Sequence, residues 1–304
     1  MKILFLGASH FSKIVLEGML NCSLNVCAVI TSPDKEVGRG HKIQANEVKV
    51  FAEKNALPVF CTEKIKNDMA QIKEIDYDMA VVASFGQILP KEFLEHRLCL
   101  NVHPSALPKY RGASPMQNTL LNGDKTTAVT IMKVGEKVDS GDIALQEEVA
   151  LRGDEYYSQL EESLGAIGAK LIAKATKMLE EKSLKFYPQN DEEATYVKKF
   201  EKKDGLLDFS QSKEALYNKT RALSEPLGVY FFYKNQKIKV FKLEPCDKEV
   251  QAFKIADDKK HFLIGCQNGS VEILSLLSPS GKRQSGADFL NGFRPQGEFV
   301  DEVH

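Results

Sequence analysis

The chain has 304 residues, of which 43% are hydrophobic and 27% are charged, and its formal net charge is -1 at pH 7. This charge balance excludes a general electrostatic attraction to nucleic acid or to a membrane surface, so only local basic patches would contact a polyanion. The length favours two domains, and no apolar run reaches the roughly 20 residues that a membrane helix needs.

Short, nearly continuous apolar runs alternate with helically spaced segments in the first part of the chain. Such runs are typical of strands in a parallel sheet, because helices cover both faces of that sheet. The strand-like runs are Lys2–Leu6, Val26–Ile30, Met79–Ala83 and Cys99–Val102, and helical spacing occurs over Phe11–Leu20 and Val48–Asn55. The pattern predicts an α/β fold with a doubly wound, mostly parallel sheet.

The next elements continue this region to about residue 186. Two further strands are predicted over Thr127–Met132 and Ile143–Val149, followed by a long amphipathic helix over Tyr156–Lys182. A polar stretch and a basic cluster then change the composition of the chain. We therefore predict a first domain over residues 1–186 and a linker over 187–205.

Residues 206–304 are predicted to form a second, β-rich domain. Its strand-like runs are Val229–Tyr233, Lys237–Leu243, His261–Cys266 and Ser270–Leu277. Asn268-Gly269 between the last two runs is a strong hairpin signal. Strands of this length and spacing favour a small antiparallel barrel.

The run from Cys99 to Pro115 has the composition of a functional site. Asn101 and His103 are two residues apart at the end of a predicted strand, so their side chains are expected on one face, at an edge where α/β proteins bind ligands. Asp139 follows in a glycine-containing loop. Singly, His103 could be a structural residue, Asn101 a turn residue and Asp139 a carboxylate that bonds its own loop. Together, an amide, an imidazole and a carboxylate suit acyl or formyl transfer.

Other patterns are less specific. The segment Gly7–Ser12 after the first strand lacks the later glycines of a dinucleotide fingerprint, and the chain has neither a Walker lysine loop nor an H-E-x-x-H helix. The loop Pro33–Lys42 contains Arg39 between two glycines, which suits phosphate contact, although a solvated surface loop is the simpler interpretation. Six scattered cysteines with no C-x-x-C pair indicate reduced thiols.

Nine segments, taken in order, resemble the methionyl-tRNA formyltransferases along nearly the whole chain. They are Thr31-Ser-Pro-Asp, Gly38-Arg-Gly, Val48-Lys-Val-Phe-Ala, Leu57-Pro-Val-Phe, Phe85-Gly-Gln-Ile-Leu-Pro, Asn101-Val-His-Pro-Ser-Ala-Leu-Pro, Tyr110-Arg-Gly-Ala-Ser-Pro, Val129-Thr-Ile-Met and Asp139-Ser-Gly-Asp. Members of this family move a formyl group from 10-formyltetrahydrofolate to the amino group of methionine on initiator tRNA. The resemblance implies a Rossmann-like formyltransferase domain and an OB-like barrel that lies along the tRNA.

The resemblance also implies roles for individual residues. The catalytic residues would be Asn101, His103 and Asp139. The folate co-substrate would contact Ser105, Ala106, Leu107 and Pro108 and also Phe85, Gly86, Ile88 and Leu89, whereas the tRNA would contact Arg39, His41 and Lys42. The family pattern at the first of these turns is Ser-Leu-Leu-Pro, so Ala106 removes an apolar contact and puts folate affinity in question. No tryptophan occurs in the chain, although the family commonly has one near Glu225-Pro-Leu-Gly.

The charge balance, the scattered cysteines and the lack of a long apolar run predict a cytoplasmic protein that contacts no membrane. The resemblance implies an enzyme of translation initiation, which we expect to act as a monomer and to need no metal. Two alternative enzyme classes use the same formyl-folate donor but a different acceptor. They are the glycinamide ribonucleotide formyltransferases, normally of one domain, and the sugar-nucleotide formyltransferases, whose acceptor is an amino sugar. A non-enzymatic RNA-binding module is a third alternative, which the neutral charge and the Asn/His/Asp set disfavour.

Overall fold

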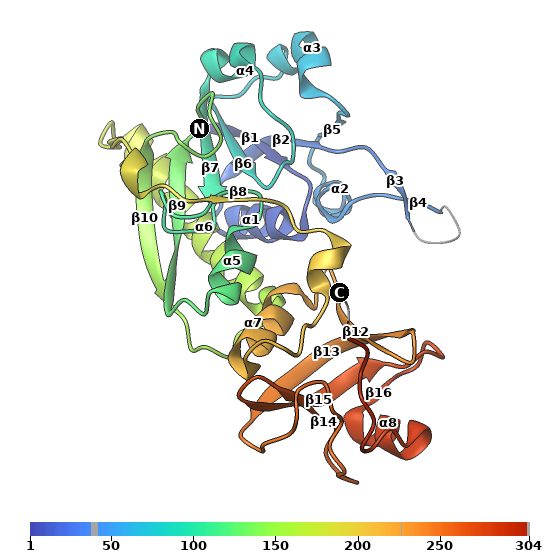
Figure 1. Ribbon diagram of the computed structural model, residues 1–304. Helices are drawn as coiled ribbons and strands as arrows, with labels where there is room; N and C mark the ends of the chain where they lie inside the picture. Colours follow the sequence, from blue (N-terminus) through green and yellow to red (C-terminus); the bar gives the residue numbers. More distant parts are fainter. Residues whose placement is uncertain (38–41, 226, 303–304) are drawn as a thin grey trace. The chain divides into compact units, whose positions relative to one another are not determined.

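The computed structural model describes residues 1–37, 42–225 and 227–302, which form two compact units (Figure 1). Unit 1 comprises residues 1–115, 126–150 and 161–197, and unit 2 comprises residues 116–125, 151–160 and 198–304. Two short internal segments therefore belong with the carboxy-terminal half. None of the helices over the described residues is long and apolar enough to cross a membrane.

Unit 1 is built on a seven-stranded sheet in the order β10-β9-β7-β6-β1-β2-β5. The strands are β1 (Lys2–Gly7), β2 (Asn25–Thr31), β5 (Val59–Cys61), β6 (Met79–Ala83), β7 (Leu98–His103), β9 (Thr126–Lys133) and β10 (Ile143–Ala150). The five strands from β7 to β5 are parallel, whereas β9 runs antiparallel to β7 and β10 antiparallel to β9. The predicted α/β fold with a mostly parallel sheet is confirmed.

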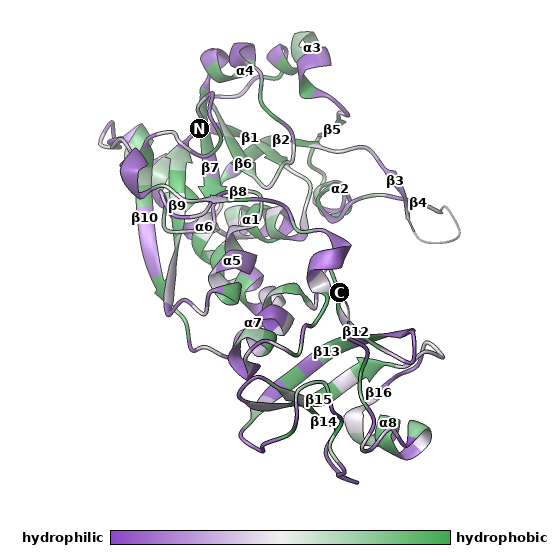
Figure 2. Cartoon of the chain, viewed as in Figure 1, coloured by the Kyte–Doolittle hydropathy of each residue, from purple (hydrophilic) through white to green (hydrophobic). Residues whose placement is uncertain are grey.

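Helices cover both faces of this sheet. They are α1 (His10–Asn21), α2 (Glu47–Lys54), η1 (Ile65–Asn67), α3 (Met69–Lys73), α4 (Lys91–His96) and most of α6 (Tyr157–Glu180), whereas α5 (Pro115–Leu121) belongs to unit 2 except for its first residue. On one face, Leu4 and Leu6 of β1 join Ile72 of α3 and Phe93 of α4 in a buried core. This burial explains why the central strands are continuously hydrophobic (Figure 2).

The opposite face is covered by α1 and α6, which approach each other and the sheet closely. A Cβ atom on Gly165 of α6 would lie 2.7 Å from Cγ2 of Ile14, and one on Gly168 would lie 2.5 Å from Cγ1 of Val102 in β7. Small residues are therefore required where α6 crosses these neighbours. This contact holds the strand that carries Asn101 and His103.

Unit 2 contains a five-stranded sheet whose pairing is antiparallel, as predicted; four of its strands overlap the four predicted runs, and β16 is additional. The strands are β12 (Val229–Tyr233), β13 (Gln236–Cys246), β14 (Leu263–Cys266), β15 (Gly269–Leu277) and β16 (Arg283–Ser285), in the order β12-β13-β15-β14 with β16 paired to β15. Cys266 pairs with Gly269 in the predicted hairpin. Helix α7 (Lys213–Leu223) packs on β13, and α8 (Gly286–Phe293) packs on β15.

The segment that composition predicts as a linker is divided between the two units. Residues 187–197 belong to unit 1, where Tyr187 pairs with Ile143 and β11 (Tyr196–Val197) pairs with β8 (Arg111–Gly112). Residues 198–205 belong to unit 2 and include the turn η3 (Lys202–Gly205). The polar composition of the segment does not reveal this arrangement, because backbone hydrogen bonds between strands can form without apolar side chains. The part in unit 1 also contains the turn η2 (Asp191–Glu193). Elsewhere in unit 1, β3 (Lys35–Val37) pairs with β4 (Lys42–Gln44).

Candidate active site

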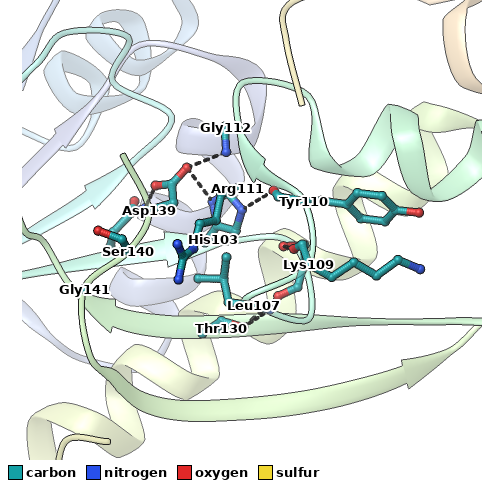
Figure 3. Close-up of polar contacts among 12 residues, drawn as sticks. His103, Leu107, Lys109, Tyr110, Arg111, Gly112, Thr130, Asp139, Ser140 and Gly141 are labelled. Atoms are coloured by element: carbon teal, nitrogen blue, oxygen red, sulfur yellow. Dashed lines mark hydrogen bonds and ion pairs between the residues drawn. The ribbon is translucent and has the colours of Figure 1, made fainter. Parts of the chain in front are cut away.

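Strand β7 and the loop between β9 and β10 bring Asn101, His103 and Asp139 together. Figure 3 shows His103 beside Asp139. The side-chain amide of Asn101 donates from Nδ2 to Oδ1 of Asp139 over 3.4 Å. The other carboxylate oxygen, Oδ2, lies 3.6 Å from Nδ1 of His103. The alternation of side chains along β7 therefore brings the amide and the imidazole to a common carboxylate.

The hydrogen bonds of His103 define the roles of its ring nitrogens. Nε2 lies 3.0 Å from the backbone carbonyl oxygen of Tyr110, and because a carbonyl oxygen only accepts, Nε2 is the donor. Nδ1 is the nitrogen that faces Asp139. The side chain of His103 is 5% exposed, and that of Asp139 is 17% exposed. Nδ1 thus faces the carboxylate of Asp139, whereas Nε2 is held by a backbone carbonyl.

The loop that carries Asp139 folds back along β7 and is held by backbone contacts. Asp139 has a positive φ of 48°, and its Oδ2 accepts from the backbone N–H of Gly112 over 2.8 Å. A Cβ atom on Gly141 would lie 1.8 Å from the carbonyl oxygen of Lys133, so only glycine fits this close approach. The loop can therefore follow this path only with a glycine two positions after Asp139.

The turn after β7 is tied to β9 and β10 by hydrogen bonds. Thr130 donates from Oγ1 to the carbonyl oxygen of Ser105 over 2.7 Å, and Gln146 donates from Nε2 to the carbonyl oxygen of Leu107 over 3.0 Å. Ser105 and Leu107 are buried, whereas Ala106 and Pro108 are partly exposed. Of this predicted folate-contacting turn, Ala106 and Pro108 are the side chains that a ligand can reach.

The loop after β6 lies at the same edge of the sheet, because β6 and β7 are neighbouring parallel strands. Phe85 is buried in the core, so its ring is not accessible to a ligand. Gly86 has a φ of 77° and open space around it, and Ile88 is 86% exposed. Leu89 is partly buried against the core. Gly86 and Ile88 are thus the most accessible of these predicted contacts.

Sequence reasoning missed two residues behind the cluster, Arg111 and Gln189. Arg111 is 1% exposed, and its Nε and Nη2 donate to Oε1 of Gln189 over 3.0 and 2.8 Å. Gln189 in turn donates from Nε2 to the backbone carbonyls of Asp139 and Gly141. Gln189 follows Asp139 by 50 positions in a polar stretch, so no local pattern relates the two.

Two of the predicted tRNA contacts, Arg39 and His41, lie outside the described residues, and Lys42 begins β4. Close to this hairpin, at the carboxyl ends of β1 and β2, is a hollow of about 310 Å³. Its polar lining includes Ser9, His10, Asn46 and Glu47. Over the described part of the chain, no group of three or more His, Cys, Asp or Glu side chains is placed to hold a metal ion.

Two family models match the chain, "Formyl transferase" over residues 1–176 and "Formyl transferase, C-terminal domain" over residues 199–294. A methionyl-tRNA formyltransferase of Carboxydothermus hydrogenoformans is 37% identical over 301 residues, which are 97% of each chain. The chain belongs to the methionyl-tRNA formyltransferase family. Another family member, from Halalkalibacterium halodurans, is 35% identical over 96% of this chain and 95% of its own.

Solved structures support the formyltransferase fold. HypX from Aquifex aeolicus in complex with tetrahydrofolic acid has a TM-score of 0.66 at 18% identity. The alignment covers the whole of this methionyl-tRNA formyltransferase family member but only 49% of HypX. An N-formyltransferase from Helicobacter canadensis, solved with folinic acid and dTDP-3-aminofucose, has a TM-score of 0.63 at 18% identity, over 90% of this chain and 98% of its own.

Proposed function

We propose that this protein transfers the formyl group of 10-formyltetrahydrofolate to the α-amino group of methionine on initiator methionyl-tRNA, which prepares this tRNA for translation initiation. The observation that carries the proposal is the cluster of Asn101, His103 and Asp139 at the edge of the sheet. Relatives that match 97% of the chain are named for this reaction.

In this proposal the neutral amine attacks the formyl carbon, and the carbonyl oxygen gains negative charge. The side-chain amide of Asn101 donates to that oxygen, a kind of contact that contributes about 3 kcal/mol to transition-state stabilisation. The carbon–nitrogen bond to the donor breaks as its nitrogen gains a proton and the attacking amine loses one. His103 moves these protons through Nδ1, and Asp139 orients the ring.

The edge formed by the loops after β6 and β7 suits a flat, aromatic co-substrate. Ile88 offers an exposed apolar side chain beside the open backbone of Gly86, and Ala106 and Pro108 are reachable from the neighbouring loop. A pteridine ring would pack on such apolar groups and hydrogen-bond to the backbone. A structural relative of the same fold was solved with tetrahydrofolic acid. These residues are the folate contacts of the proposal.

In the same proposal, residues 1–186 form the catalytic domain and residues 206–304 the tRNA-contacting domain, and the segment 187–205 between them is divided between the two units. Lys237 and Lys239 are exposed on β13, and the guanidinium of Arg283 lies 4.1 Å from the ring centre of Phe241. Exposed cations beside aromatic rings are typical of surfaces that contact RNA. Arg39, between β3 and β4, is the proposed contact to the acceptor end of the tRNA. The protein would act in the cytoplasm, where its six free thiols stay reduced.

A transfer assay with three acceptors tests the proposal. The purified protein is mixed with 10-formyltetrahydrofolate and with charged initiator tRNA, an amino-sugar nucleotide or glycinamide ribonucleotide. We expect formylation of the aminoacyl-tRNA alone. Transfer to either small acceptor but not to the tRNA would contradict the proposal, and binding of tRNA with no transfer to any acceptor would favour a non-enzymatic RNA-binding module.

A further inference from the structure

Gln189 connects the Asp139 turn to a buried arginine by four hydrogen bonds. Its Nε2 donates to the carbonyl oxygen of Asp139 over 2.9 Å and to that of Gly141 over 2.7 Å. Its Oε1 accepts from Nε and Nη2 of Arg111 over 3.0 and 2.8 Å. One side chain thus links both carbonyls that flank Ser140 to a guanidinium.

These partners fix the orientation of the amide. A guanidinium only donates and a carbonyl oxygen only accepts, so the oxygen of Gln189 faces Arg111 and its NH₂ group faces the turn. The reversed amide would place donor against donor and acceptor against acceptor at all four contacts. Arg111 is itself held, because Nη1 donates to the hydroxyl of Tyr196 over 3.0 Å and Nη2 to Asp191 over 2.7 Å.

The Asp139 turn benefits from such an anchor. Asp139 has a positive φ of 48°, a conformation that residues other than glycine adopt at a cost. Its carboxylate is aimed at Asn101 and His103 only while the backbone keeps this conformation. The backbone N–H of Gly112, next to Arg111, contacts the same carboxylate. Arg111 is therefore connected through Gln189 to the backbone of Asp139, and the neighbouring Gly112 contacts the side chain of Asp139.

We propose that Gln189 is a positioning residue for the transfer reaction, which holds the Asp139 turn in the conformation that directs the carboxylate at His103. The inference rests on the proposed function and extends it to a residue that contacts no reacting atom. Gln189 acts on the backbone of Asp139, so its loss is expected to slow the chemical step more than it weakens the binding of either substrate.

Gln189→Glu separates positioning from folding. The new carboxylate keeps a favourable pairing with Arg111, but it places an acceptor oxygen against the carbonyls of Asp139 and Gly141. We expect kcat to fall about 10- to 100-fold, since small misplacements of a reacting group cost rates of this order. The KM values for folate and tRNA should stay within about twofold of wild type, and the melting temperature should be nearly unchanged.

Asp191→Asn is the matched control. Asp191 contacts the same Nη2 of Arg111, and its side chain is 77% exposed. We expect this variant to keep the wild-type kcat. Gln189→Met removes the hydrogen bonds of Gln189 without adding a charge. It provides a second variant if the Gln189→Glu protein does not fold, and it should also lower kcat.

Hydrogen exchange at the Gly112 amide provides a readout that does not depend on activity. This N–H donates to Asp139, so its protection should be reduced in Gln189→Glu and Gln189→Met and retained in Asp191→Asn. If the wild-type protein transfers no formyl group, the proposed function is wrong, but the exchange measurement still decides whether Gln189 holds the turn. Wild-type kcat and wild-type Gly112 protection in both Gln189 variants would overturn the inference. So would a loss of protection that is uniform over the whole sheet.

Discussion

At the residue scale, Asn101, His103 and Asp139 form one unit, because the single carboxylate of Asp139 lies against both of its partners. We expect Asn101→Ala to lower kcat by about 10²- to 10³-fold through loss of the donor to the developing oxyanion. His103→Ala and Asp139→Ala should each lower kcat by about 10²- to 10⁴-fold. The measurement is formyl transfer to charged initiator tRNA under saturating conditions.

Combined variants sharpen this test. Residues that act as one unit lose activity non-additively, so the double variant of His103 and Asp139 should be little worse than the poorer single variant. Asn55→Ala, at an exposed asparagine that ends α2, is a control that should leave kcat unchanged. Three folded single variants with near-normal transfer would rule out the proposed catalytic roles.

A second residue-scale prediction concerns Arg39. A guanidinium between two glycines can pair with a phosphate with little steric hindrance. We expect Arg39→Ala to raise KM for charged tRNA about tenfold or more, which corresponds to the loss of about 1.4 kcal/mol, with the KM for the folate donor nearly unchanged. Arg97→Ala in the same unit serves as the control. An equal rise in both KM values would count against a tRNA contact at Arg39.

At the element scale, the position of β7 depends on helix α6. Gly168 lies so close to Val102 that an added Cβ would approach its Cγ1 to 2.5 Å. Val102 stands between Asn101 and His103 in β7, so pressure on it displaces both. We expect Gly168→Val to destabilise the fold by about 1–3 kcal/mol, as overpacking of a core does, and to reduce kcat in the fraction that stays folded.

A glycine with open surroundings provides the comparison for this prediction. Gly292 in α8 has no atom within 4 Å of an added Cβ. Gly292→Ala should therefore be neutral or slightly stabilising, because alanine favours the helix. Thermal unfolding and kcat, measured on the same preparations, compare the Gly168→Val and Gly292→Ala proteins with wild type. A Gly168→Val protein with wild-type stability and activity would show that α6 does not constrain β7.

At the scale of the whole molecule, the net charge of -1 gives no overall attraction to tRNA. Binding should then depend on a few local phosphate contacts, each of which releases counterions. With two to three contacts, raising the salt concentration from 50 to 200 mM should raise KM for tRNA roughly 10- to 40-fold. The KM for the folate donor should change much less.

Replacement of two of the exposed cations tests where these contacts lie. The double variant Lys239→Gln and Arg283→Gln should reduce the slope of log KM for tRNA against log salt by about two. A double variant in unit 1, Lys64→Gln and Lys66→Gln, should leave the slope unchanged; both lysines are exposed. An unchanged slope in the first variant would remove β13 and β16 from the proposed tRNA surface.

Local patterns were sufficient for most of the strands. Met79–Ala83 and Val229–Tyr233 have the predicted bounds, and α6 begins one residue later and ends two residues earlier than the predicted helix. These elements bury a continuous or striped apolar surface, and such a surface is visible in the sequence. Short elements such as α3 and β8 were missed because each has only a few residues and depends on its neighbours for support.

The sequence by itself determined the residue types of the cluster, the face that Asn101 and His103 share, and the order of strands and helices that makes a parallel sheet. Only the tertiary structure decided that Asp139 meets both of them, that Phe85 is buried while Ile88 is exposed, and that Gln189 holds the turn from a stretch predicted as a linker. The physical reason is the separation along the chain of the residues that interact. Strand and helix patterns depend on residues a few positions apart, whereas the hydrogen bonds that orient Asp139 join segments 38 and 50 positions apart and leave no periodic trace along the chain.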